Sequence, residues 1–176
     1  MKKRTLLVLI LVNFVCAFTA HSQESYSQGY HNALGVRLGG LTTGITIKHF
    51  TTSTTALEGI LGFSHRSFIV TGLFEKQKPI ENAEGLSWFY GGGAHIGFFR
   101  YGGYYYYYGN GNPHYRYYVL EEGGSTAIVG LDFIIGLDYK FQNAPFDIGL
   151  DLKPFIDFQD GVYGYWDGAL SLRFTF

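Results

Sequence analysis

The chain has 176 residues, of which 15% are charged and 19% are aromatic, and its formal net charge is −1 at pH 7. The near balance of basic and acidic residues argues against a nucleic-acid-binding surface, which would need an excess of Lys and Arg. One cysteine excludes an intrachain disulfide framework, and the abundance of Gly (25), Phe (16) and Tyr (15) suits curved β structure.

Residues 1–22 are predicted to be a secretion signal. A basic start at residues 2–4 precedes an apolar run at residues 6–18, and Ala20-His21-Ser22 fits a cleavage site with small residues. The apolar run is shorter than the roughly 20 residues of a membrane-spanning helix. Removing the three basic residues of the signal from the thirteen leaves ten against fourteen acidic residues, a formal charge of −4. The remaining chain has the length of one domain, about 154 residues.

A second reading of the N-terminus is a lipoprotein signal in which Cys16 carries the lipid, although Val15 stands where such signals have a small residue. We adopt cleavage after Ser22, which leaves no cysteine for thiol chemistry. Residues 23–32 are then a short periplasmic segment, and residues 33–176 form the main domain.

Eight stretches of this domain alternate between apolar and polar residues with a period of two, the pattern of a strand with two different faces. They are residues 33–39, 44–50, 55–63, 67–76, 86–99, 129–140, 146–153 and 163–176. Most approach the about 9–11 residues that cross a membrane obliquely. Pro154 cannot donate a ladder hydrogen bond, so we predict that it lies near a rim or a bulge. The sequence therefore predicts an all-β fold, an eight-stranded antiparallel up-and-down barrel.

The alternation leaves open which face points outward. A soluble lipocalin-like barrel would hold the apolar residues inside and the charges in water. Here the apolar faces carry almost no charge, and the opposite faces combine Gly with charges of both signs, which suits the inverted arrangement of a membrane barrel. Aromatic residues gather near the predicted strand ends, as an interfacial girdle requires: Trp88, Phe89, Tyr90, Phe98, Phe99, Tyr163, Tyr165, Trp166, Phe174 and Phe176. We predict the transmembrane barrel.

The charged residues of the polar faces would then lie in the lumen. An eight-stranded barrel is just wide enough for side chains to fill it, and buried charges are tolerated when they pair and hydrogen-bond. We predict a plug-like polar network of Arg37, Lys48, Glu58, Glu75, Asp132, Asp138, Lys140, Asp147, Asp151, Lys153, Asp157 and Arg173. The alternative use of such a lumen is a narrow channel for ions or small solutes.

Two stretches carry a family resemblance: residues 30–40 (Tyr-His-Asn-Ala-Leu-Gly-Val-Arg-Leu-Gly-Gly) and the closing residues 172–176 (Leu-Arg-Phe-Thr-Phe). They resemble the small eight-stranded bacterial outer-membrane barrels, in particular the outer membrane protein beta-barrel group common in Bacteroidetes. The resemblance implies export to the outer membrane and contact with outer-membrane lipids. It also implies that Phe174 and Phe176 form the signal that the barrel assembly machinery recognises. We predict a monomer with a structural, adhesive or envelope-accessory role.

The longest predicted connection, residues 100–123, is rich in tyrosine. Long connections lie outside the cell in such barrels, while periplasmic turns are short; the connection 77–85 is long for a periplasmic turn. Tyrosine offers a large amphipathic contact area at low entropic cost. Two interpretations of this connection stay open. The flanking strands could extend beyond the membrane as a ribbon whose tyrosines lie at the interface. The segment could also form an extracellular binding patch for a protein, a glycan or a lipopolysaccharide headgroup, made by Tyr104, Tyr105, Tyr106, Tyr107, Tyr108, Tyr115, Arg116 and Tyr117.

Enzymatic chemistry finds little support. His65 and Ser67 with Glu75 resemble a Ser-His-acid set of a lipid-modifying enzyme, but Glu75 would lie about 26 Å away along an extended strand. Histidines His31, His49, His65, His95 and His114 lack metal-ligand spacing and are interpreted as lone surface or rim residues. We predict no catalytic residue, metal or cofactor.

Overall fold

The computed structural model describes residues 29–64, 67–101, 105–109, 116–120, 124–158 and 161–176, so the predicted signal peptide and residues 23–28 lie outside the described residues. The described chain forms ten strands: β1 (Asn32–Gly39), β2 (Thr43–Thr52), β3 (Thr55–Ser64), β4 (Ser67–Pro79), β5 (Leu86–Tyr101), β6 (Tyr105–Gly109), β7 (Arg116–Leu120), β8 (Gly124–Lys140), β9 (Phe146–Phe158) and β10 (Val162–Thr175). No helix in these ranges is long and apolar enough to cross a membrane.

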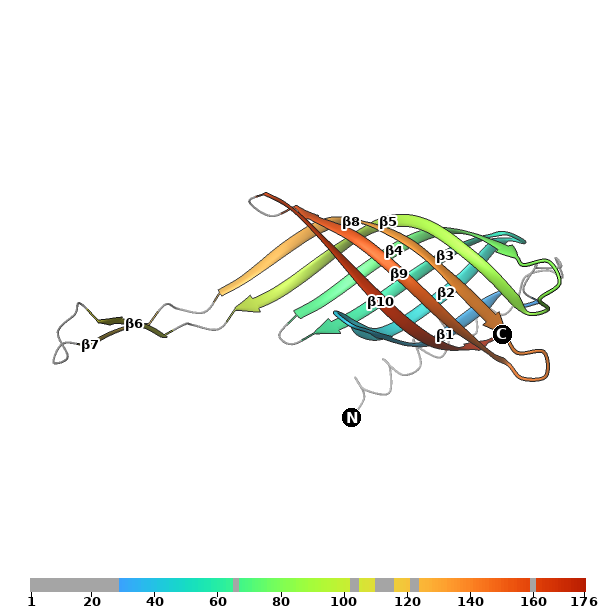
Figure 1. Ribbon diagram of the computed structural model, residues 1–176, viewed down its shortest axis with the longest axis horizontal. Helices are drawn as coiled ribbons and strands as arrows, with labels where there is room; N and C mark the ends of the chain where they lie inside the picture. The colour runs from blue at the N-terminus through green and yellow to red at the C-terminus, as the bar shows by residue number, and fades with distance from the viewer. Residues whose placement is uncertain (1–28, 65–66, 102–104, 110–115, 121–123, 159–160) are drawn as a thin grey trace, which may run out of the picture.

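Eight of these strands close into one antiparallel barrel in the order β1-β10-β9-β8-β5-β4-β3-β2 (Figure 1). Each neighbouring pair is antiparallel, and β1 pairs with β10 from Ala33↔Thr175 to Gly39↔Ala169, which joins the two ends of the sheet. The predicted fold, an eight-stranded antiparallel up-and-down barrel, is confirmed.

The two ends of the barrel differ. We call the end that carries the β1–β2, β3–β4, β5–β8 and β9–β10 connections the mouth, and the end with the other three connections the base. β6 and β7 pair only with each other, from Tyr105↔Leu120 to Gly109↔Arg116. In Figure 1 this hairpin stands beyond the mouth ends of β5 and β8. Of the predicted binding patch, the backbones of Tyr105 to Tyr108, Arg116 and Tyr117 belong to the hairpin, and Tyr104 and Tyr115 lie outside the described residues.

The base turn between β4 and β5 is shorter than the sequence indicated, because β4 continues to Pro79. Residues 80–85 close it with hydrogen bonds from Ile80 N to Leu86 O (2.9 Å) and from Leu86 N to Ala83 O (3.0 Å). Asn82 and Gly85 take positive φ angles of 62° and 80°, which Asn and Gly adopt more readily than other residues. The three base connections are short: residues 53–54, 80–85 and 141–145 lie between the strands.

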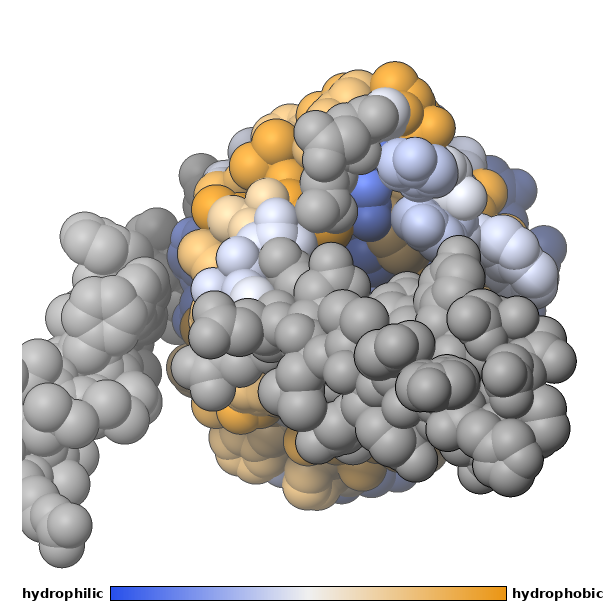
Figure 2. All heavy atoms as spheres, turned by 90° about the vertical axis from the view of Figure 1, so that its left-hand side faces the viewer, coloured by the Kyte–Doolittle hydropathy of each residue, from blue (hydrophilic) through white to orange (hydrophobic). Residues whose placement is uncertain are grey.

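The apolar side chains of the barrel strands point outward. Along β8 the outward row Val129, Leu131, Phe133, Ile135, Leu137 and Tyr139 is 39–57% exposed, and the residues between them are buried or half-buried. Figure 2 views the mouth and shows hydrophobic residues on the outer wall and hydrophilic residues within the opening. The soluble arrangement, with apolar residues inside, is thus not the one observed.

Exposed aromatic rings lie near both ends of this outer surface. At the base Trp88 stacks on Tyr90 with ring centroids 5.2 Å apart, and at the mouth Phe68 stacks on Phe98 at 6.0 Å. Phe89, which we placed in the girdle, is only 1% exposed. Since its neighbours on both sides point outward, strand alternation turns Phe89 into the lumen. Phe99, also predicted for the girdle, lines the mouth of the lumen for the same reason.

Pro154 lies within β9 rather than at a rim. It pairs with Trp166 of β10, and the β8–β9 ladder skips from Asp132↔Phe155 to Ile135↔Leu152 beside it. The register is the same on both sides of the gap, so the predicted alternative of a bulge is wrong; Pro154 lies four residues before Phe158, the mouth end of β9. Because Pro has no N–H, it interrupts the ladder locally.

Candidate functional site in the barrel lumen

Eleven of the twelve charged residues predicted for the lumen are buried inside the barrel. They come from seven strands and are Arg37, Lys48, Glu58, Glu75, Asp132, Asp138, Asp147, Asp151, Lys153, Asp157 and Arg173. Lys140 is the exception: its Nζ donates to the carbonyls of Phe141 and Ala144, both at 2.8 Å. As the last residue of β8, Lys140 binds the base turn rather than the network.

Arg173 is the centre of the base half. Its guanidinium, 2% exposed, donates from Nε to Asp147 Oδ1 at 2.7 Å and contacts Asp138, and its Nη1 lies 3.4 Å from Glu58 Oε1. Gly149 makes room for this group, because a Cβ there would lie 2.6 Å from Asp138 Oδ1 and 2.8 Å from Arg173 Nη2. One cation thus holds three carboxylates from β3, β8 and β9 together.

Lys48 joins a further strand to the same cluster. Its Nζ lies 2.8 Å from Glu75 Oε2 and 2.8 Å from Asp138 Oδ2. The ammonium also sits 4.2 Å from the centroid of the Phe89 ring, a favourable cation–π contact in a dry site. Lys48 and Asp138 are at most 1% exposed, so this base cluster is closed to solvent.

Tyr30 closes the base from below. Its hydroxyl donates to Asp147 Oδ2 at 2.7 Å, and its ring meets Phe50 edge-on at 5.3 Å. Together with Ala33 and Ala56 these rings form a small buried apolar cluster. Tyr30 belongs to the segment predicted as periplasmic, so sequence reasoning missed this role; no periodic pattern precedes β1 to reveal it.

Arg37 forms the ion pairs in the middle of the lumen. It donates to Asp151 Oδ1 at 2.6 Å and to Asp167 Oδ2 at 3.0 Å. Asp167 also accepts from the backbone N of Leu41 (2.9 Å) and from Thr42 Oγ1 (2.8 Å), which ties the β1–β2 connection to β10. Asp167 was absent from the predicted network, although it occupies the same polar face of the closing strand as Arg173.

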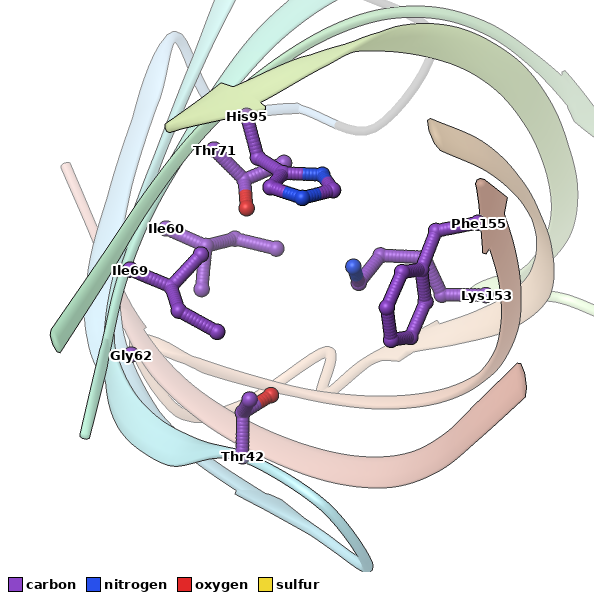
Figure 3. A pocket seen from close by; sticks show the side chains of 8 residues that line it. All are labelled: Thr42, Ile60, Gly62, Ile69, Thr71, His95, Lys153 and Phe155. Carbon is purple, nitrogen blue, oxygen red and sulfur yellow. The ribbon is translucent and has the colours of Figure 1, made fainter. Parts of the chain in front are cut away.

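His95 organises the mouth half. Its Nδ1 lies 2.7 Å from Asp132 Oδ2 and its Nε2 lies 3.0 Å from Asp157 Oδ1. Lys153 Nζ lies 2.6 Å from the other Asp132 oxygen. His95 is only 7% exposed, so its interpretation as a surface or rim histidine is wrong: its position on β5 faces the lumen. Figure 3 shows its ring across the space from Lys153 and Phe155.

The other histidines do not join this site. The ring of His49 is half-buried, with Nδ1 2.8 Å from Asn32 Oδ1, and stacks edge-on with His31 at 4.6 Å. His65 and His114 lie outside the described residues. Within the parts of the chain that the structure describes, no group of three or more His, Cys, Asp or Glu is arranged to hold a metal ion.

The free space of the lumen lies at the mouth. A cavity of about 510 Å³ opens there above His95 and Asp157. Below it, the space between Ile60, Thr71 and Lys153 narrows to about 10 Å³ (Figure 3), which is room for about one water molecule. The ion pairs of Arg37, Arg173 and Lys48 fill the barrel beneath.

Ser67 and Glu75, the serine and the acid of the Ser-His-acid set, lie at opposite ends of the barrel. Ser67 begins β4 at the mouth, whereas Glu75 is buried in the base cluster beside Lys48. The third member, His65, lies outside the described residues. The arrangement offers no pairing of this serine with that acid.

Comparison with solved structures places the fold. The chain is similar to the crystal structure of the N-terminal β-barrel domain of Pseudomonas aeruginosa OprF, with a TM-score of 0.61 and 15% sequence identity. The match covers 82% of this chain and 95% of that one. No protein-family model and no curated protein matches the chain. The likeness shows that this is the same kind of eight-stranded barrel.

Proposed function

We propose that this protein is an integral barrel of a bacterial outer membrane with a structural, adhesive or envelope-accessory role. The observation that carries the proposal is the inversion of the barrel: apolar residues cover the outer wall and paired charges fill the inside. An exposed apolar surface that encircles a whole domain is unfavourable in water and favourable in a bilayer. The surrounding partners are then outer-membrane lipids.

The closed base favours a structural role over transport. Arg173, Lys48 and Tyr30 bridge the lumen to carboxylates of opposite strands. Removing one partner of such a pair leaves an uncompensated buried charge, at a cost of about 3–5 kcal/mol. A solute would have to break several of these contacts to pass, so the network acts as a plug.

The β6–β7 hairpin is the proposed adhesive element. Its register pairs Tyr107 with Tyr118 and Tyr108 with Tyr117. Because successive residues of a strand belong to opposite faces, both faces of the ribbon carry tyrosine positions. We propose that it binds an extracellular protein or glycan when the mouth faces outward.

Export and assembly complete the proposal. Residues 1–22 would direct secretion, and Phe174 and Phe176, both exposed on the base end of the outer surface, would be recognised by the barrel assembly machinery. We further propose a monomer of the Bacteroidetes type, without a catalytic function. Changing Ser67 to Ala should then leave the lipid A of the producing cell unchanged.

The decisive experiment is heat-modifiability of the mature protein taken from outer-membrane fractions. We expect unheated and boiled samples to run at different apparent masses on SDS gels, because membrane barrels resist SDS until heated. A soluble periplasmic protein without this shift would refute the proposal. A variant with Ser in place of Tyr105, Tyr106, Tyr107 and Tyr108 should keep the heat-dependent change in apparent mass. It should no longer bind a glycan array or host-cell surfaces.

A narrow channel for ions or small solutes is the second candidate, and the mouth cavity favours it. Planar-bilayer recording separates the two. The structural proposal expects no resolved conductance steps from the wild-type barrel. Regular steps that increase when Arg173 is replaced by Ala would establish the channel instead.

A further inference from the structure

The mouth cavity has the size and lining of a small-molecule site. Its volume of about 510 Å³ falls within the roughly 300–1,000 Å³ of typical ligand pockets. Its apolar wall comes from Ile69, Phe99, Ile128 and Phe155. One carboxylate, that of Asp157, stands on this wall. Such a lining suits a ligand with an apolar body and one polar end.

The contacts of His95 leave one carboxylate oxygen in need of a hydrogen-bond donor. The ring meets Asp132 with Nδ1 (2.7 Å) and Asp157 with Nε2 (3.0 Å). A neutral imidazole donates from one nitrogen only and accepts at the other. If Nδ1–H donates to Asp132, then Nε2 faces the Asp157 oxygen without a proton between them. The Asp157 oxygen therefore needs a donor from another group.

The surrounding charges do not remove this need. Lys153 is the one cation that lies near the three groups among the described residues, and its Nζ is committed to Asp132 at 2.6 Å. Asp157 lies on the cavity side with its side chain 13% exposed, against 0% for Asp132. The Asp157 Oδ1 atom has no hydrogen bond of proper geometry within the described residues. A cation arriving from the mouth thus meets Asp157 first.

Aromatic rings beside Asp157 strengthen the preference for a cation. Phe155 meets the His95 ring edge-on at 5.6 Å, and Tyr165 stacks on Phe155 at 5.4 Å. The Lys153 Nζ already lies 4.6 Å from the centroid of the Phe155 ring. Tyr165 is 47% exposed, so its ring can attract an ammonium group beside the carboxylate. Among the described residues that line the cavity, an anion would meet the carboxylate of Asp157 and no Lys or Arg.

We propose that the mouth cavity binds a small organic amine, with its ammonium group on Asp157 and its apolar body against Ile69, Phe99 and Ile128. The ammonium supplies the hydrogen bond that Asp157 lacks, and His95 keeps its contact with Asp132. This function is independent of whether the barrel is adhesive or structural.

The test is calorimetric titration of the refolded full mature chain in detergent with phenethylamine. We expect saturable binding. The neutral 2-phenylethanol and the acid 3-phenylpropionate should bind at least tenfold more weakly. Equal binding of the three compounds, or no saturable binding of the amine, would overturn the proposal.

The matched variants are Asp157→Asn and Glu84→Gln. An Asn amide can donate to His95 Nε2 and so keep the fold, but it lacks the charge that holds the ammonium. We expect Asp157→Asn to weaken phenethylamine binding at least tenfold. Glu84→Gln, in the exposed base turn, should leave the affinity unchanged. Heat-modifiability of each variant verifies the barrel, and an unchanged affinity in a folded Asp157→Asn barrel would contradict the assignment.

Discussion

The same eight strands form the base and the mouth of the lumen, but inward side chains fill the base and leave the mouth partly open. At the base, large side chains such as Arg173, Phe50 and Phe89 point inward and are at most 2% exposed. At the mouth, inward positions hold shorter side chains such as Thr42, Gly62 and Ile69, and the free space of the lumen lies between them. The difference teaches that the residues on the inner face, rather than the strand number, decide whether a narrow barrel is plugged or receptive.

The largest expected effect comes from removing the central cation of the base. Arg173→Met leaves Asp138, Asp147 and Glu58 without their shared partner. We expect the free energy of unfolding in lipid vesicles, measured by urea titration, to fall by about 3–5 kcal/mol.

The mouth supplies the contrast. Lys153→Met removes a cation that pairs with Asp132 alone, and Asp132 keeps its contact with His95. The loss should be less than half that of Arg173→Met. Equal losses at the two sites would show that the lumen is one uniform network and would break the comparison.

A charged substitution on the outer surface tests whether this surface faces the lipid bilayer. Ile135 lies near the middle of the outward row of β8 and is 52% exposed. Arg on the lipid face near the midplane costs about 2–4 kcal/mol, so Ile135→Arg should lower the stability in vesicles by this amount. Ser125→Arg, on the same strand beyond the apolar row, should cost less than about 1 kcal/mol. A harmless Ile135→Arg would place this wall outside a membrane.

Substitution of one glycine in each half by Ala compares how tightly the base and the mouth are packed. At the base, Gly149→Ala would put a Cβ 2.6 Å from Asp138 Oδ1, and such overpacking costs about 1–3 kcal/mol. At the mouth, a Cβ on Gly62 would meet its nearest neighbour, Thr42 Cβ, at 3.4 Å, which is ordinary contact. We expect the urea midpoint to drop for Gly149→Ala and to stay within error for Gly62→Ala; the reverse order would show that the base is the looser half.

The smallest effect is expected at Pro154. Pro154→Ala restores an N–H beside the gap in the β8–β9 ladder, and one new hydrogen bond contributes about 1 kcal/mol or less. Amide exchange at Phe133 and Ile134 should slow while the unfolding midpoint hardly moves. Faster exchange there would mean that the proline stabilises this part of the wall rather than interrupting it.

The strands of the barrel wall, and the face to which most of their residues belong, can be predicted from the sequence. Period-two alternation predicted all eight barrel strands, and observed ends such as Pro79 of β4 and Gly124 of β8 differ from prediction by three to five residues. The same alternation placed charged residues such as Arg37, Lys48 and Arg173 on the inner face, because side chains of a strand leave alternately on two sides. It failed at Phe89, where aromatic character was weighed above position.

The contacts of the lumen were decided by the tertiary structure. Arg173 and Glu58 are 115 residues apart in sequence, and Tyr30 and Asp147 are 117 apart, so their pairing depends on the register of strands around the closed sheet. A period of two states which face a residue occupies but not which residue stands across the lumen. The sequence by itself determined an inverted eight-stranded barrel; closure of the sheet decided that Lys140 leaves the network, that Asp167 and Tyr30 enter it, and that His95 lies between two carboxylates.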